Sequence, residues 1–427
     1  MLAVMPAHGW AQGDNTAVKG RELTVAGGQE TAASTVQATA LSKRVLTGID
    51  VLEQENFASL KQGKPQITIG LLTNQTGLDA RGRRTIDILA STSGIKLAAI
   101  FSPEHGIFGA LDTTRIDNST DAATAVPVYS LYGSTDAKRR PPVEILKTLD
   151  AVVVDIQDAG ARFYTYETTL GYMLEAAAES NIELVVLDRP SPITGSLVQG
   201  PLSASDFKRT FTNYFSIPVR HGMTLGELAQ LFNVERKIGA RLRVISMEGW
   251  RRDEWFDSTG VNWINPSPNL RSVNEAALYP GVALIEGTNV SVGRGTDTPF
   301  EVIGAPWIDS HSLAAFLNAR RIPGLRFVPA AFTPISGPYA NHVCNGVNLV
   351  LTDRNRLDSP EAGLELALAL HSLYPRDWKI GNMVYSLANR PLFEQLKAGG
   401  DPRNLEQGWR EDLEKFTMLR AKYLLYK

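Results

Sequence analysis

The sequence contains a single cysteine, Cys344, among 427 residues. One thiol cannot form an intrachain disulfide and cannot build a cysteine-based metal site. A chain of this length buries enough apolar surface without covalent cross-links, so the lack of disulfides does not exclude an exported protein. The six histidines are scattered along the chain without the spacing of metal ligands. We therefore expect no metal.

An excess of charge of one sign is also missing. The chain has 43 Lys and Arg against 45 Asp and Glu, which gives a formal net charge of -2. This balance offers no electrostatic attraction to nucleic acid or to an anionic membrane surface. No stretch approaches the roughly 18 uninterrupted apolar residues that a membrane-spanning helix needs. We expect neither a nucleic-acid partner nor an integral membrane segment.

Several well-known binding and catalytic motifs are absent. The first apolar run is not followed by GxGxxG, and the chain has no GxxxxGK[ST], so the usual phosphate-binding loops are missing. GRG at 293–295 lacks the strand and helix that such a loop requires. HExxH and GxSxG do not occur either, which argues against a zinc protease and an α/β-hydrolase. We expect no organic cofactor.

The first residues, MLAVMPAHGWAQG, resemble the tail of a secretory signal. They contain a short apolar run followed by small residues, but the basic segment and longer apolar core of a full signal peptide are missing. The polar, small-residue stretch that follows is typical of a linker after such a signal. We favour a start upstream of Met1 over a simple disordered leader, and expect a periplasmic or secreted protein with residues 1–44 outside the fold.

Four nearly continuous Val/Ile/Leu runs, each followed by a loop, alternate with helical patterns. Strand and loop together cover 67–77, 96–106, 151–166 and 182–195. Continuous runs of this kind are typical of strands buried on both faces in a parallel sheet. The sequence predicts an α/β fold: a Rossmann-like, doubly wound, mostly parallel sheet over residues 45–292. Residues 293–427 are predicted to form a smaller α+β domain that completes the cleft.

Each of these four strands ends in a loop rich in polar groups. The carboxyl ends of parallel strands lie at the same sheet edge, so the loops are expected to converge on one crevice. The polar side chains brought there would be Asn74, Glu104, His105, Asp155, Gln157, Asp158, Arg162, Tyr164, Tyr166, Asp188 and Arg189. Any one of them has a structural explanation, such as a solvated turn or an ion pair. Four such loops at one edge of the sheet predict a ligand-binding or catalytic site there.

The mixture of side chains favours a sugar ligand. Tyr164 and Tyr166 offer flat aromatic faces for C–H surfaces, and planar amide, carboxylate and guanidinium groups suit hydroxyls. Those planar groups belong to Asn74, Gln157, Asp158 and Arg162. An arginine also suits a carboxylate on the ligand.

Glycoside hydrolysis requires little beyond two carboxyl groups. Glu104 is the leading candidate for the acid, because burial against Phe101, Ile107 and Phe108 would favour its protonated form. For the partner, Glu167 is placed near the crevice at a helix N-terminus, which would favour its ionised form. Glu175, two turns further along, has the pattern of an exposed helix-face carboxylate.

Four motifs in this order resemble the NamZ/YbbC family of bacterial exo-β-N-acetylmuramidases. They are SPEHGIFG, DIQDAGARFYTY, LDRPSPITG and EGTNVSVGRGTDTPFE, and the resemblance runs from about residue 45 to the C-terminus. It implies a Rossmann-like domain with the active-site cleft and a smaller C-terminal domain. It further implies a glycoside hydrolase that releases N-acetylmuramic acid from the non-reducing ends of peptidoglycan fragments.

The resemblance also implies roles for individual residues. The family's PEHG glutamate falls on Glu104, and a second family glutamate aligns with Glu175. We therefore expect Glu175 to be the second carboxylate, with Glu167 as the alternative. Arg162, Asn289 and Arg294 become expected ligand contacts, and His105 is expected to bind sugar or orient Glu104. Retaining, inverting and substrate-assisted mechanisms all stay open. The rival functions are a non-catalytic cell-wall sugar-binding protein and a different α/β transferase or hydrolase.

Overall fold

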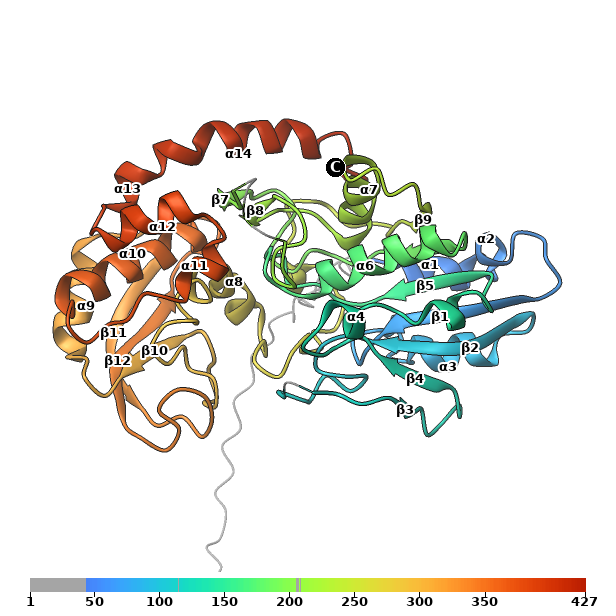
Figure 1. Ribbon diagram of the computed structural model, residues 1–427, viewed down its shortest axis with the longest axis horizontal. Helices are drawn as coiled ribbons and strands as arrows, with labels where there is room; N and C mark the ends of the chain where they lie inside the picture. The colour runs from blue at the N-terminus through green and yellow to red at the C-terminus, as the bar shows by residue number, and fades with distance from the viewer. Residues whose placement is uncertain (1–43, 114, 205–206, 208) are drawn as a thin grey trace, which may run out of the picture. The chain divides into compact units, whose positions relative to one another are not determined.

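The computed structural model describes residues 44–113, 115–204, 207 and 209–427 (Figure 1). The expected leader lies almost entirely outside these residues. Residues 42–427 form one compact unit. Within the described residues, no helix is long and apolar enough to cross a membrane.

The central sheet is the predicted doubly wound sheet. Its strand order is β3-β4-β2-β1-β5-β6-β9, and every pair except β3–β4 is parallel. With the six parallel strands counted in chain order, this is the Rossmann order 3-2-1-4-5-6. The strands are β1 (Ile67–Thr73), β2 (Ile95–Ser102), β3 (Ser119–Thr120), β4 (Pro127–Ser130), β5 (Ala151–Asp155), β6 (Glu183–Leu187) and β9 (Arg241–Ile245).

Alternate residues of the central strands enter two separate cores, one on each face of the sheet. On β5, Val152 and Val154 belong to one cluster, whereas Val153 belongs to the other. Because successive strand side chains point to opposite faces, a strand covered on both sides must be apolar throughout. One face packs against α6 (Tyr166–Glu179) and α7 (Leu225–Glu235). The other packs against α1 (Gly48–Gln54), α2 (Ala58–Lys61) and α3 (Thr85–Ser91).

The C-terminal part contains a second, antiparallel sheet, in the order β10-β12-β11. Its strands are β10 (Val302–Ala305), β11 (Leu325–Phe332) and β12 (Cys344–Leu351). The helices of this part are α9 (Ser310–Ala319), α10 (Ser359–Leu373), α11 (Met383–Leu387), α12 (Arg390–Lys397), α13 (Pro402–Leu405) and α14 (Gln407–Arg420). This arrangement confirms the predicted smaller α+β part.

The remaining elements link the two sheets or flank the first. They are α4 (Asp136–Arg139), α5 (Val143–Leu146), the β7–β8 pair (Gln199–Leu202 and Pro218–Arg220), a short 3₁₀ turn (Phe256–Ser258) and α8 (Val273–Val282). The larger core cluster continues from the first sheet through Tyr164 and Tyr279 to Phe300 and the second sheet.

The C-terminus returns to the first sheet. From α14 the chain runs toward α7 (Figure 1), where the Leu425 amide donates to Glu227 (2.9 Å). Tyr426 then donates its hydroxyl hydrogen to Asp188 Oδ2 (2.6 Å). Asp188, which follows β6, therefore serves this packing contact.

Candidate active site

The loop after β2 turns sharply and carries Glu104 and His105. The Gly106 amide donates to the Pro103 carbonyl (3.1 Å), which closes a tight turn. His105 has a φ of 70°, a left-handed conformation that non-glycine residues rarely adopt. Such strain persists only where the surrounding contacts hold it, and it concentrates at functional sites.

The His105 ring helps to hold this turn. Its Nδ1 lies 2.8 Å from the Leu111 carbonyl oxygen. A carbonyl oxygen only accepts, so Nδ1 donates the hydrogen of this bond, and Nε2 is the ring nitrogen left for other contacts. The ring thereby fixes the loop and keeps Nε2 for a ligand.

Glu104 and His105 line a cavity of about 280 Å³. The other lining residues are Asp112, Phe163, Tyr164, Thr165, Ser267, Tyr279, Arg294 and Phe300. They come from the loops after β2 and β5, from the 259–272 segment, from α8 and from the turn before β10. The loops that follow the carboxyl ends of β2 and β5 thus form part of the cavity wall, and later segments close it.

Glu104 is half-buried, and the Thr165 hydroxyl donates a hydrogen bond to its Oε2 (2.6 Å). The hydrophobic wall around Glu104 differs from the expectation. Phe101 is buried and Ile107 is partly buried, but Phe108 is exposed. Phe108 lies at the tip of the tight loop, where the turn directs its side chain into solvent.

Arg294 is the cation of the cavity. Its Nε forms an ion pair with Glu286, and its Nη1 lies 3.7 Å from Asp112 Oδ2. The Asn269 amide also donates to Asp112 Oδ2 (3.1 Å). Burial opposes the charge of Arg294, but the Glu286 carboxylate outweighs burial and raises the Arg294 pKa above its ordinary value. Arg294 is therefore a permanent cation that is loosely paired on its cavity side.

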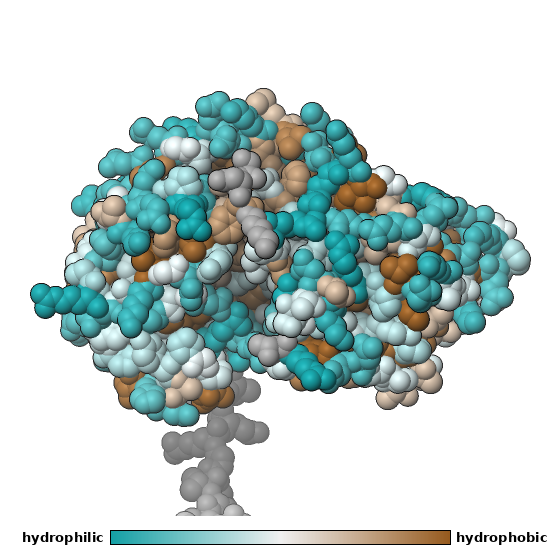
Figure 2. Space-filling view, viewed as in Figure 1, coloured by the Kyte–Doolittle hydropathy of each residue, from teal (hydrophilic) through white to brown (hydrophobic). Residues whose placement is uncertain are grey.

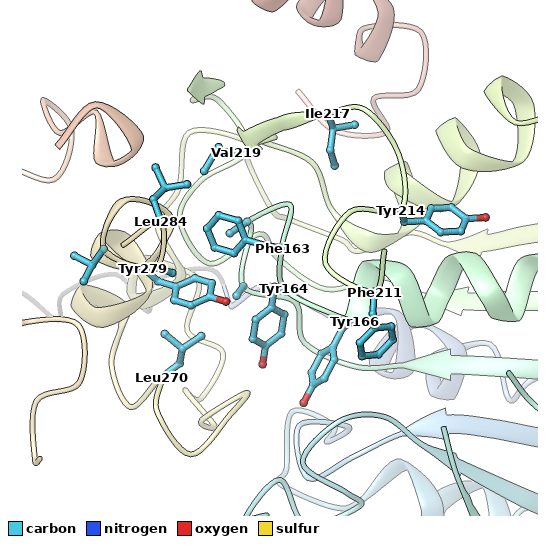
Figure 3. Close-up of a cluster of buried hydrophobic side chains, with 14 of the residues drawn as sticks. Phe163, Tyr164, Tyr166, Phe211, Tyr214, Ile217, Val219, Leu270, Tyr279 and Leu284 are labelled. Carbon is cyan, nitrogen blue, oxygen red and sulfur yellow. The ribbon is translucent and has the colours of Figure 1, made fainter. Parts of the chain in front are cut away.

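Tyr164 and Tyr166 have different surroundings. Their rings pack edge to face with centroids 4.6 Å apart (Figure 3). The Tyr166 hydroxyl accepts from Asn74 Nδ2 (2.9 Å) and donates to the Pro266 carbonyl (2.8 Å), so both polar groups serve packing. The Tyr164 hydroxyl is buried and has no partner among the described residues, although its side chain lines the cavity. The ring of Tyr164, rather than its buried hydroxyl, is therefore the part that a ligand in the cavity can contact.

Two family models, one for each domain of the same enzyme family, match adjoining parts of the chain. Residues 69–274 match the N-terminal domain of exo-β-N-acetylmuramidase NamZ, and residues 277–426 match its C-terminal domain. The peptidoglycan β-N-acetylmuramidase NamZ of Bacillus subtilis is 41% identical over 392 residues, which cover 91% of this chain and 93% of that protein. The chain belongs to the NamZ family.

Two solved structures resemble the fold of this NamZ-family chain. Both are DUF1343 family proteins from Bacteroides fragilis, and the alignments cover 90% of this chain and 99% of each of them. One has a TM-score of 0.77 at 34% identity, and the other a TM-score of 0.73 at 30% identity.

Both NamZ domains contribute to the cavity. Glu104, Asp112 and Tyr164 lie in the N-terminal match, whereas Arg294 and Phe300 lie in the C-terminal match. The two matches meet within α8, which places the family boundary earlier than the 292/293 division expected from the sequence. That division stays a prediction.

Four of the expected ligand contacts bond to the protein itself. Gln157 Nε2 donates to the Pro190 carbonyl (2.8 Å), and Asp158 Oδ2 accepts from the Gly160 amide (2.7 Å). Fully buried Arg162 donates only to main-chain carbonyls. The Asn289 side chain bonds to main-chain atoms of residues 377 and 379. In the described residues none of these four lines the Glu104 cavity. A long polar side chain in a loop can point either way. Gln157, Asp158 and Arg162 point inward, whereas the half-buried Asn289 binds a neighbouring segment.

Neither expected partner of Glu104 lines the cavity. Glu175 binds Arg140, Arg209 (2.9 Å) and Arg236 (3.0 Å) in an ion-pair cluster. Burial alone would raise the Glu175 pKa, but hydrogen bonds, above all from Arg140, hold it below the ordinary value. Glu167 is fully buried, and burial raises its pKa well above the ordinary value. The expectation of an ionised Glu167 is thus reversed, because desolvation outweighs the helix N-terminus.

Sequence reasoning missed several cavity residues, above all Asp112, Thr165, Ser267 and Tyr279. Thr165 stands inside RFYTY, and Ser267 inside a polar NPSPN stretch, so both had a local signal. Asp112 follows the SPEHGIFG motif by three residues, in a loop whose path the sequence does not determine. Among the residues that the structure describes, no group of three His, Cys, Asp or Glu side chains is arranged to hold a metal ion.

Proposed function

We propose that this protein is an exo-acting β-N-acetylmuramidase that hydrolyses non-reducing terminal N-acetylmuramic acid from peptidoglycan fragments. The observation that carries the proposal is the Glu104 carboxyl group, held at the wall of an open cavity built from both NamZ domains. The 41% identical relative from Bacillus subtilis is named as a peptidoglycan β-N-acetylmuramidase.

Glu104 acts as the general acid. Thr165 donates to Oε2, so that oxygen acts as an acceptor and Oε1 carries the transferable proton. Protonation of the glycosidic oxygen by this group lets the leaving sugar depart as a neutral alcohol. His105 Nε2 contacts a sugar hydroxyl, and the Tyr164 ring forms part of the wall against the sugar.

Asp112 takes the second role that the sequence assigned to Glu175 or Glu167. Besides Glu104 it is the carboxylate that lines the cavity in the described part of the chain. Its Oδ2 accepts a hydrogen bond from the Asn269 side-chain amide (3.1 Å), which orients the carboxylate. In this position Asp112 either assists the attacking water or orients the 2-acetamido group of the substrate.

Arg294 selects the muramyl sugar. N-acetylmuramic acid differs from N-acetylglucosamine by a lactyl ether that carries a carboxylate, and a guanidinium fork binds carboxylates with two parallel hydrogen bonds. Arg294 Nη1 lies 3.7 Å from Asp112 Oδ2, which is too long for a strong hydrogen bond, so this side of the guanidinium group can bind the lactyl carboxylate.

We also propose export to the periplasm or cell surface. Peptidoglycan lies outside the cytoplasmic membrane, and the first residues resemble the end of a secretory signal. A fractionation of cells that express the chain from its genomic start would place the protein outside the cytoplasm; a cytoplasmic pool alone would refute export.

The direct test is hydrolysis of the disaccharide N-acetylmuramyl-β-1,4-N-acetylglucosamine, with di-N-acetylchitobiose as the matched substrate without the lactyl group. We expect release of N-acetylmuramic acid from the first and negligible cleavage of the second. Arg294→Lys keeps the charge but loses the fork, and should raise KM for the muramyl substrate about tenfold. Binding without turnover would instead identify a sugar-binding protein.

A further inference from the structure

The cavity has room for one sugar ring. Its volume of about 280 Å³ lies just below the range that is typical of ligand sites, about 300–1,000 Å³. On the proposed function, on which this inference rests, the muramyl ring fills the cavity. The leaving sugar must then lie at its rim, on surfaces beside the residues that line the cavity.

Two loops beside the cavity carry an unusual share of exposed large hydrophobic side chains. Eleven such side chains are found in the described residues, and four of them lie in the segments 103–112 and 333–343. The face of the protein that Figure 2 shows is mostly hydrophilic, with hydrophobic residues in separate patches. Scattered exposed hydrophobic residues are ordinary, but a concentration next to a site marks a contact surface.

The first of these loops is anchored to the cavity at both ends. Glu104 and His105 line the cavity at its start, and Asp112 lines it at its end. Between them stand Phe108, which is 70% exposed, and Leu111, which is 47% exposed. Two hydrogen bonds stabilise this loop. The His105 ring binds the Leu111 carbonyl (2.8 Å), and the Gly109 amide donates to the Gly106 carbonyl (3.1 Å). These bonds therefore hold the loop that carries Phe108 beside the cavity.

The second loop is bonded to the turn that carries Arg294. The Ile335 amide donates to the Gly295 carbonyl (2.9 Å). The Ile335 side chain is 79% exposed, the largest value among these hydrophobic side chains, and Val343 is 59% exposed. A side chain at Gly337 would come within 3.9 Å of Arg294 Cβ, so this loop lies directly beside the cavity-lining arginine.

We propose that Phe108, assisted by Ile335, forms the binding surface for the leaving sugar, the N-acetylglucosamine on the reducing side of the scissile bond. A pyranose ring presents apolar C–H faces, which a flat phenyl ring covers without needing hydrogen bonds. Contact with the leaving sugar removes the exposed apolar area of both side chains from water. Binding energy from this remote sugar also aligns the glycosidic oxygen with Glu104.

The test compares two substrates that differ only in the leaving group: the muramyl disaccharide and methyl β-N-acetylmuramide, whose methyl group cannot reach the rim. Release of N-acetylmuramic acid is measured for wild type, Phe108→Ala, Ile335→Ala and the control Met418→Ala, an exposed side chain on α14 that is 67% exposed.

We expect Phe108→Ala to lower kcat/KM for the disaccharide about tenfold, the factor for losing roughly half the burial free energy of a phenyl side chain. The methyl glycoside should change by less than about twofold, because it has no sugar to contact Phe108. Ile335→Ala should show a smaller loss of the same pattern, and Met418→Ala none. An equal loss on both substrates, or no loss on the disaccharide, would overturn the inference. A wild type that releases no N-acetylmuramic acid from either substrate would instead refute the proposed function.

Discussion

Arg162 was expected to contact the ligand, but its surroundings in the structure predict that replacing it lowers the stability of the fold rather than ligand binding. The fully buried guanidinium donates to the carbonyls of Pro201 (3.1 Å) and Ile217 (3.1 Å). It also donates to the carbonyls of Ser386 (2.8 Å) and Leu387 (2.8 Å), which belong to the C-terminal part. Burial lowers the Arg162 pKa to about 10, so the group stays charged at neutral pH.

The cost of Arg162→Met follows from these four bonds. Each carbonyl loses a charged donor, and an unsatisfied buried acceptor costs about 1–3 kcal/mol. Four acceptors at the lower end of that range give about 4 kcal/mol. This agrees with the loss of about 3–5 kcal/mol that is typical when one partner of a buried charged interaction is removed. Methionine keeps the packing of the apolar stem, so the polar loss dominates.

Urea unfolding of wild type and Arg162→Met measures this difference, with Arg251→Met as the control, because Arg251 pairs with Asp253 on the surface. We expect a loss of about 4 kcal/mol in the free energy of unfolding, an unchanged KM for the folded variant, and no measurable effect of Arg251→Met. A variant with wild-type stability and a strongly raised KM would refute the structural role and restore Arg162 as a ligand contact.

Three further predictions follow from buried ionisable groups. Glu175→Gln breaks the three-arginine cluster and should lower Tm while kcat stays within about twofold of wild type; a kcat loss as large as that of Glu104→Gln would contradict this. Glu167→Gln should preserve both stability and kcat, because burial raises the pKa of the carboxyl and favours its uncharged form. A large loss of kcat at unchanged Tm would restore Glu167 as the second carboxylate. Burial raises the pKa of Asp158 to about 7. The protonated carboxyl therefore stabilises the fold fully below about pH 4, and this stabilisation is lost as the pH rises through 7. In Asp158→Asn the free energy of unfolding should fall less steeply between pH 4 and 7 than in wild type, and an unchanged slope would refute this.

The sheet was predictable because its signal is strong and local. β1, β5 and β6 contain nearly continuous apolar runs (ITIGLL, AVVV and LVVL), as burial on both faces requires. β4 escaped prediction because its four residues, PVYS, are too few and too mixed to show a pattern. That strand matters, since it completes the Rossmann order.

The site was predictable at the level of loops and less so at the level of side chains. Glu104 and His105 were found because a strand ends just before them, and strand ends meet at one edge. Whether a loop side chain points to the cavity or inward depends on contacts far away in sequence. Arg162 illustrates this, because two of its acceptors lie more than 200 residues later. Asp112 was missed for the same reason, since only the folded loop returns it to the cavity.

The central claim is that Glu104 is the general acid, and its most direct test varies the leaving group. Kinetics of wild type and Glu104→Gln are compared on the muramyl disaccharide and on 2,4-dinitrophenyl β-N-acetylmuramide, whose leaving group departs without protonation. We predict a loss of about 10²–10⁴ in kcat on the disaccharide and a much smaller loss on the dinitrophenyl glycoside. Equal losses on both substrates, or wild-type kcat on the disaccharide, would contradict the assignment of Glu104.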